Sequence, residues 1–239
     1  MTNDELYDIL IKRGATRLCH FTKTKSLVHI LDSIEGIVAS DFIKSDIKNQ
    51  NDLSRCDGQT DYVCCSLEYP NSWYWKKAVN RDQDLVFSDW VVLVIDLSII
   101  KQAKIKYSPC NAAKNNGYYI SEDLSKFYKL FDNPLTIGQP RYRETNMLKC
   151  CPTDDQAEIL IYKNIPLRYI KSIIVGHENA ANNINAILKA LDKNIEIIIA
   201  PDVCNTNWSR LVRLGVRPTE EKYKSDINNG GKIWMQYHH

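Results

Sequence analysis

The chain has 239 residues, of which 44% are hydrophobic, and this is enough to bury a sizeable core within one domain. No run approaches the roughly 18 apolar residues of a membrane span, and residues 1–5 lack the basic and apolar regions of a secretion signal, so we expect a cytoplasmic protein with no membrane partner. The formal net charge of +2 is too small to indicate an anionic partner, because phosphates respond to a local basic patch.

The first third of the sequence predicts two helices, two strands and a long loop. Apolar residues recur at helical spacing over 3–13 and again from residue 24 to about 31. Short strands are expected over 17–21 and 62–67. The stretch 41–61 is polar and nearly without apolar residues, and loops of that length usually serve a function or are disordered.

The middle of the chain predicts short elements separated by a second long loop. A short aromatic helix is expected over 72–79, an almost wholly apolar strand over 90–97 and a helix over 121–131. The stretch 132–155 contains three prolines and a glycine, so it cannot form a regular element and should be a surface loop. It leads directly into a strand expected over 156–162.

The remaining elements decide the fold class. Strands are expected over 169–175 and 196–200, with a helix between them whose apolar stripe runs from Ala180 to Leu191. Strands and helices alternate too irregularly for a doubly wound parallel sheet, which predicts an α+β fold.

Eight cysteines are scattered along the chain or stand in adjacent pairs, as in Cys64-Cys65 and Cys150-Cys151. A disulfide framework is typical of short secreted proteins, so we expect reduced thiols. The Cys-x-x-Cys spacing of zinc sites does not occur, and we expect no metal.

An acid with an amide beside it, a histidine and an arginine are candidates for chemistry. In the predicted strand 156–162, period-two alternation places Gln156 and Glu158 on one face, so that an amide and an acid are presented together. His20 ends the first predicted strand, and Arg55 lies in the first polar loop. Each residue taken alone has an ordinary structural reading, as a solvent-facing acid, a satisfied histidine or a surface arginine.

Basic and aromatic groups leave further alternatives open. Basic residues cluster over 101–106, 141–143 and 208–224, where they form either solvated faces or contacts to nucleic acid. The aromatic group over 69–75 either floors a ligand pocket or packs in the core.

Four features in this order resemble the DarT family of nucleic-acid ADP-ribosyltransferase toxins. They are Cys19-His20-Phe21-Thr22, the loop arginine, the segment Ser66-Leu67-Glu68-Tyr69-Pro70-Asn71, and Gln-x-Glu after a long loop. The resemblance covers about residues 17–175 and implies one ADP-ribosyltransferase domain over 1–239, in which 201–239 is an extension without an identified counterpart. It also implies a split, mixed and largely antiparallel β-core with flanking helices that clasps NAD between two sheets.

The resemblance also implies roles for individual residues. His20 matches the histidine that holds the adenosine-side ribose of NAD, with Thr22 beside it, and Arg55 matches the arginine that contacts the NAD phosphates and helps the target base react. Glu158 matches the catalytic acid. The remaining implied contacts are Ser66, Asn71 and Tyr74 to NAD, and Gln156, Arg141, Tyr142 and Arg143 to nucleic acid. Asn111-Ala112-Ala113 is a further candidate family element without an assigned role.

The implied activity is transfer of ADP-ribose from NAD to a nucleobase. Cleavage of the nicotinamide–ribose bond develops positive charge on the sugar, which a carboxylate such as Glu158 stabilises. An acceptor base is easier to reach in a single strand than in a duplex, so we expect single-stranded DNA to be preferred over RNA. A toxin of this kind implies a DarG-like macrodomain antitoxin or a role in phage defence.

Two alternatives remain at this stage. The same fold and NAD site would serve an RNA- or protein-modifying transferase, because the fold does not fix the acceptor. The basic clusters and aromatic residues would also suit a non-enzymatic nucleic-acid-binding module. The Ser66–Asn71 segment differs from the aromatic-proline version of thymidine-modifying relatives, so the target base stays open.

Overall fold

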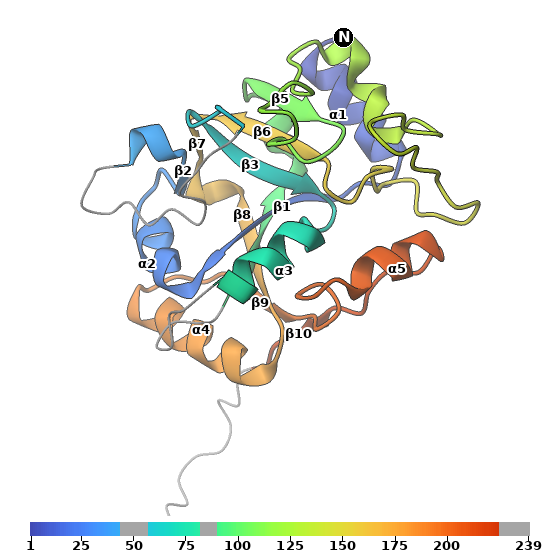
Figure 1. Cartoon of the computed structure of the whole chain (residues 1–239). Coiled ribbons are helices and arrows are strands. Elements are labelled where there is room, and N and C mark those ends of the chain that lie inside the picture. Colours follow the sequence, from blue (N-terminus) through green and yellow to red (C-terminus); the bar gives the residue numbers. More distant parts are fainter. Residues whose placement is uncertain (44–56, 82–89, 225–239) are drawn as a thin grey trace, which may run out of the picture.

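The computed structural model describes residues 1–43, 57–81 and 90–224, and within them a strongly bent mixed sheet is surrounded by helices (Figure 1). The elements in chain order are α1 (Asn3–Lys12), β1 (Arg17–Lys23), α2 (Thr24–Asp32), β2 (Ile37–Val38), η1 (Ser40–Phe42), β3 (Tyr62–Leu67), α3 (Ser72–Arg81), β4 (Trp90–Asp96), η2 (Leu97–Lys101), β5 (Ile105–Ser108), η3 (Leu124–Phe131), β6 (Glu158–Tyr162), β7 (Asn164–Ile165), η4 (Leu167–Tyr169), β8 (Ile170–Val175), α4 (Glu178–Ala190), β9 (Glu196–Ile199), α5 (Asn207–Arg213) and β10 (Glu221–Lys222), where η marks a 3₁₀ helix.

The main sheet of the described residues has the strand order β10-β9-β8-β4-β1-β3-β6-β5, and β2 pairs with β7 in a small second sheet. Every pair in the main sheet is antiparallel except β8–β9, which is parallel. The predicted α+β class and the mixed, largely antiparallel core are therefore confirmed.

The most apolar strand, β4, lies at the centre of the sheet. Residues Trp90 to Ile95 of β4 are all buried, as expected for a strand covered on both faces. β4 lies between β1 and β8, and these strands carry much of the core. The strand at the centre of the sheet is thus the one whose sequence has no polar face.

Helices cover the sheet where their apolar stripes meet it. α2 packs on β1, α4 packs on β8 and β9, and α1 packs on η2 at the far end of the molecule (Figure 1). α1 begins with a capping box in which Thr2 and Glu5 satisfy each other's backbone N–H groups. α4 buries Ala180, Ile184 and Leu188, which is the predicted stripe.

The structure differs from the predicted elements in several places. The first strand, expected over 17–21, continues to Lys23, so His20 lies inside β1 and not at its end. The strand expected over 156–162 begins only at Glu158, because Gln156 lies in a turn. In this turn the backbone N–H of Gln156 donates to Asp154 Oδ1. The helix expected over 121–131 is a 3₁₀ helix, η3. The short elements β2, β5, β7, α5 and β10 were not predicted, since runs of two to seven residues carry little periodicity.

Two further expectations concern cysteines and membrane spans. None of the seven cysteines within the described ranges is in a disulfide, and the sulfur atoms of Cys150 and Cys151 lie 3.8 Å apart. Helices long and apolar enough to cross a membrane are absent from residues 1–43, 57–81 and 90–224.

Candidate active site

The site lies where β1 and β3 separate. In the described part these strands pair only through Leu18–Leu67 and Cys19–Ser66. Beyond Cys19, β1 continues along β4 as far as Lys23, whereas residues 62–65 of β3 pair with β6. The sheet is therefore split, and strand residues on both sides of the split face a common cavity.

This cavity has a volume of about 790 Å³, within the range of about 300–1,000 Å³ typical of ligand pockets. Its walls come from β1, the α2–β2 segment, β3, the start of α3, a loop after β5 and the first residue of β6. Of the predicted site residues, the cavity brings together His20, Thr22, Ser66, Asn71, Tyr74 and Glu158. Sequence positions 20 to 158 thus converge on one space.

His20 bridges the split. Its Nδ1 lies 2.8 Å from the carbonyl oxygen of Cys64 on β3. Because a carbonyl oxygen only accepts, Nδ1 is the donor in this contact. Thr22 on β1 and Ser66 on β3 are buried hydroxyl residues that also line the cavity. The two strands therefore both contribute polar side chains to the cavity.

Glu158 lines the cavity as the first residue of β6, where it pairs with Ser108 of β5. Its Oε1 lies 3.3 Å from the amide nitrogen of the Asn111 side chain and 3.3 Å from the backbone nitrogen of Ala112. The side-chain nitrogen of Asn71 lies 3.5 Å from the same oxygen. Donors from separate segments converge on one carboxylate oxygen, an environment that suits an ionised acid.

Asn71 connects this acid to α3. Its side-chain oxygen accepts from the backbone N–H of Tyr74, so the amide nitrogen is the group directed at Glu158. Tyr74 lines the cavity and its ring lies 5.7 Å from that of Phe21 on β1. The aromatic group over 69–75 is divided, because Tyr69 and Trp75 are buried in the core, while Tyr74 faces the cavity and Trp73 is exposed.

The loop after β5 contributes a site residue to which sequence reasoning assigned no role. Asn111 holds its own loop through an N–H from Ala113 and turns its amide nitrogen toward Glu158. A side chain at Gly117 would approach the backbone oxygen of Asp57 to 2.6 Å, so glycine allows the loop to lie close against this cavity residue. The available signal was the polar run over 111–117 within a stretch of weak periodicity.

Both arginines of the long loop 132–155 interact with groups of the same loop. Arg143 donates to the carbonyls of Leu148 and Cys151, and burial lowers its pKa from the ordinary value. Arg141 pairs with Asp154 at 3.2 Å, and burial still raises the pKa of this aspartate. Tyr142 is 63% exposed.

The structure brings some of the predicted residues to the cavity and leaves others away from it. None of Arg141, Tyr142, Arg143 and Gln156 lines the cavity. Arg55 lies outside the described residues.

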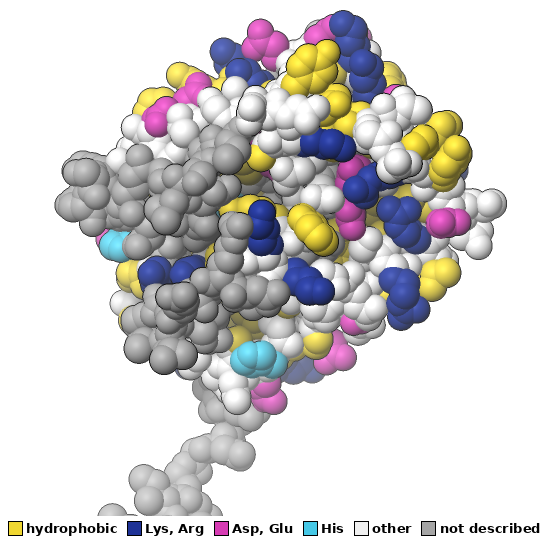
Figure 2. Space-filling model, in the orientation of Figure 1, with side chains coloured by type: hydrophobic (Ala, Val, Ile, Leu, Met, Phe, Trp, Pro, Cys, Tyr) yellow, Lys and Arg dark blue, Asp and Glu magenta, His cyan; other side chains and the backbone are white. Residues whose placement is uncertain are grey.

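Surface charge on the visible face is mixed. Lys and Arg side chains lie over α3 and α5, with acidic side chains between them (Figure 2). In the described ranges, moreover, no three His, Cys, Asp or Glu side chains are grouped in a way that could hold a metal ion. Besides Glu158 and His20, the cavity lining includes the carboxylates of Asp32, Glu35 and Asp57 and the imidazole of His29, together with amides and hydroxyls.

Comparison with solved structures shows the same fold in enzymes of known ligands. Thermus sp. 2.9 DarT in complex with ADP-ribosylated ssDNA superimposes with a TM-score of 0.57 at 13% identity, over 80% of this chain and 96% of that one. The same protein in complex with NAD⁺ gives 0.53 at 15% identity, over 79% and 97%. Thermosipho africanus DarTG in complex with ADP-ribose gives 0.54 at 18% identity, over 79% of this chain and 50% of that one.

The sequence comparison is more specific than the structural one. No curated protein matches the chain at a significant level. The family described as "ssDNA thymidine ADP-ribosyltransferase, DarT" matches residues 19–208, which include every cavity residue described above. This chain therefore belongs to the DarT family of ADP-ribosyltransferases.

Proposed function

We propose that this protein transfers ADP-ribose from NAD to a nucleobase of single-stranded DNA, with thymine as the first acceptor to test. The family description names thymidine in ssDNA. The observation that carries the proposal is the position of Glu158, which shares one cavity with His20 although 138 residues separate them in the sequence, from 20 to 158. An acid alone would be an ordinary feature, whereas an acid fixed by amide donors inside a cavity of this size suits a sugar-transfer reaction.

We assign the NAD-binding roles to the polar cavity residues. His20 and Thr22 on β1 and Ser66 on β3 would hold the dinucleotide across the split, since all three side chains line the cavity. Tyr74 offers an aromatic surface beside them. Arg55, the predicted phosphate contact, stays part of this proposal from the sequence alone.

Glu158 is the proposed catalytic residue. The bond between the anomeric carbon and the nicotinamide nitrogen breaks with its electron pair leaving on nicotinamide, and the sugar develops positive charge. A carboxylate close to the ribose stabilises that charge, while a nitrogen of the acceptor base forms the new bond and passes its proton to Glu158 or to solvent water. Amide donors from Asn71 and Asn111 would hold the acid in place for this step.

For the nucleic acid we propose the loop 132–155 with Gln156 at its end. Exposed Tyr142 would stack on a base, and partly exposed Arg141 would approach phosphate. The bonds of Arg143 to loop carbonyls support a second role for it in shaping the loop.

The decisive experiment is incubation of the purified protein with radiolabelled NAD and homopolymer oligonucleotides of each base, as DNA and as RNA. We expect label on single-stranded DNA, and Glu158→Gln should abolish it while the melting temperature stays close to that of the wild type. Glu178→Gln, an exposed acid at the start of α4, is the matched control and should be fully active. Label on RNA or protein alone would establish another acceptor, and no label with any acceptor would refute the transferase assignment.

We further propose that the protein acts as a toxin in the cytoplasm, where NAD and DNA are both available, and that a DarG-like macrodomain protein reverses its modification. Expression of the intact chain in bacteria should stop growth, and Glu158→Gln should restore it. Co-expression of a macrodomain hydrolase that removes ADP-ribose from DNA should also restore growth. Normal growth of cells that accumulate modified DNA would contradict the toxin role.

A further inference from the structure

The turn that joins β3 to α3 is anchored on the side away from the cavity. It comprises Glu68 to Asn71, and Glu68 adopts a left-handed backbone with φ of +67° although it is not glycine. Its side chain is 1% exposed. A buried carboxylate on a strained backbone persists only where surrounding groups hold it, so its partners define the turn.

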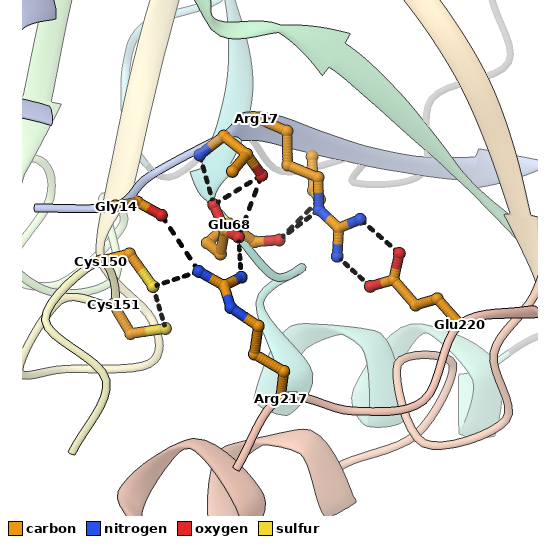
Figure 3. A network of polar contacts seen from close by, with 9 residues as sticks. Gly14, Arg17, Glu68, Cys150, Cys151, Arg217 and Glu220 are labelled. Carbon is orange, nitrogen blue, oxygen red and sulfur yellow. Dashed lines mark hydrogen bonds and ion pairs between the residues drawn. The ribbon is translucent and has the colours of Figure 1, made fainter. Parts of the chain in front are cut away.

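Arg217 is the main partner of this carboxylate. Its Nη1 lies 2.7 Å from Glu68 Oε1, and this hydrogen bond raises the pKa of Arg217 above its ordinary value. The backbone nitrogen of Thr16 donates to the other carboxylate oxygen at 2.8 Å. Arg217 also donates to the carbonyl of Gly14, so it ties the turn to the start of the chain (Figure 3).

Glu220 secures the same turn through Arg17. The Arg17 side chain donates to the backbone oxygen of Glu68 at 2.8 Å, and its two terminal nitrogens form a bidentate pair with the Glu220 carboxylate (Figure 3). Burial acts to lower the pKa of Arg17, but the hydrogen bonds to Glu220 raise it above the ordinary value. Bidentate geometry of this kind fixes orientation as well as distance.

The opposite end of the turn reaches the reacting carboxylate. Asn71, three residues after Glu68, is 3% exposed and directs its amide nitrogen at Glu158 Oε1. Arg217, and Glu220 through Arg17, therefore hold one end of the turn at Glu68, and the other end contacts Glu158 through Asn71. Arg217 and Glu220 both lie beyond residue 208, the last residue that the family match covers.

We propose that Arg217 and Glu220 are positioning residues for the transferase reaction, which act through the Glu68–Asn71 turn to hold Asn71 against Glu158. This inference rests on the proposed function of Glu158. The C-terminal segment thereby becomes part of the catalytic apparatus without touching substrate. If Arg217 were only a structural anchor, replacing it would lower the stability of the protein. Its effect on kcat would then be independent of the effect of replacing Asn71.

The test is a double-mutant cycle on the rate of ADP-ribose transfer to the oligonucleotide that the wild type modifies. Arg217→Gln and Glu220→Gln should each lower kcat on the order of tenfold, because a misplacement of about 1 Å can cost about a hundredfold and these residues act on Glu158 through one hydrogen bond. The KM for NAD should change less than twofold. Arg217→Gln combined with Asn71→Ala should be no slower than the slower single variant, since both remove the same contact.

Lys222→Gln is the control in the same segment, because the ion pair of Lys222 with Glu196 lies on the exposed β9–β10 edge and does not touch the turn. Its kcat should equal that of the wild type. Folded Arg217→Gln and Glu220→Gln with wild-type kcat, or a double variant whose losses multiply, would overturn the inference. If Arg217→Gln does not fold, Glu220→Gln carries the same cycle. An inactive wild type would instead refute the proposed function.

Discussion

At the scale of single residues, one carboxylate oxygen organises the site. Glu158 Oε1 is approached by donors from the α3 start and from the loop after β5, at distances of 3.3 to 3.5 Å. These contacts are longer than the usual 2.9–3.0 Å of protein hydrogen bonds, so each one contributes modestly. Their joint effect is orientation, because an acid held from two sides has little freedom to rotate.

Replacement of Asn111 by alanine is expected to lower kcat for ADP-ribose transfer roughly tenfold, since a hydrogen bond to a charged group contributes about 1.5–3 kcal/mol and the contact here is long. The KM for NAD should hardly change. Single-turnover kinetics with saturating NAD measures the effect. Asn115→Ala, in the same loop and exposed, is the control. An Asn111→Ala enzyme with wild-type kcat would show that the amide does not hold Glu158.

At the scale of elements, short segments are fixed by caps and turns more than by periodicity. The 3₁₀ helix η2 begins where Asp96, at the end of β4, accepts from the backbone nitrogen of Ser98 at 2.9 Å. Burial acts to raise the pKa of Asp96, but the bonds from Ser98 and the ion pair with Lys171 outweigh it and lower the pKa. The ionised cap is therefore the form that stabilises the fold.

Asp96→Ala should lower the free energy of unfolding at pH 7 by about 1 kcal/mol, the usual effect of losing an N-cap. Because the folded pKa is lowered, the contribution of Asp96 is fully present above its unfolded value of about 3.9 and is lost as the pH falls through the folded value. Urea unfolding from pH 7 to about pH 3 should show the two proteins converging. Asp96→Asn should keep most of the cap, and a constant difference down to pH 3 would contradict this account.

At the scale of the whole molecule, the split of the sheet creates the site, and the segment after residue 200 packs against the sheet edge and the β3–α3 turn. β10 joins the sheet edge, and Trp208 at the start of α5 stacks on Tyr69 of the β3–α3 turn with ring centroids 5.3 Å apart. Trp208 is 3% exposed. These contacts support the proposal that residues 1–239 form one domain that includes the extension after residue 200.

Trp208→Ala should cost roughly 3–5 kcal/mol of stability, because it removes a large buried aromatic side chain. If the extension belongs to the same domain, calorimetry and near-ultraviolet circular dichroism should report a single transition at a lower melting temperature. Leu214→Ala, at a position 58% exposed, is the control and should change stability by less than about 0.5 kcal/mol. Two separate transitions, of which only one is shifted, would contradict the single domain.

The amino-acid sequence alone determined the class of the fold and the chemical type of several site residues. Apolar periodicity placed α2 at Thr24 and β3 over Tyr62–Leu67, as found. The motif around His20 and the acid at Glu158 identified the family, which the comparison over residues 19–208 confirms. These features are local, because a strand pattern or a short motif is written in consecutive residues.

Only the tertiary structure decided which of these residues meet. The split between β1 and β3 arises because each strand finds a different partner, and this choice depends on strands distant in the sequence. For the same reason Asn111 had no assigned role until its loop lay against Glu158, and Arg217 appeared as an ordinary basic residue until it met the buried Glu68. Contacts between distant segments depend on the packing of the whole chain, so a pattern of consecutive residues does not predict them.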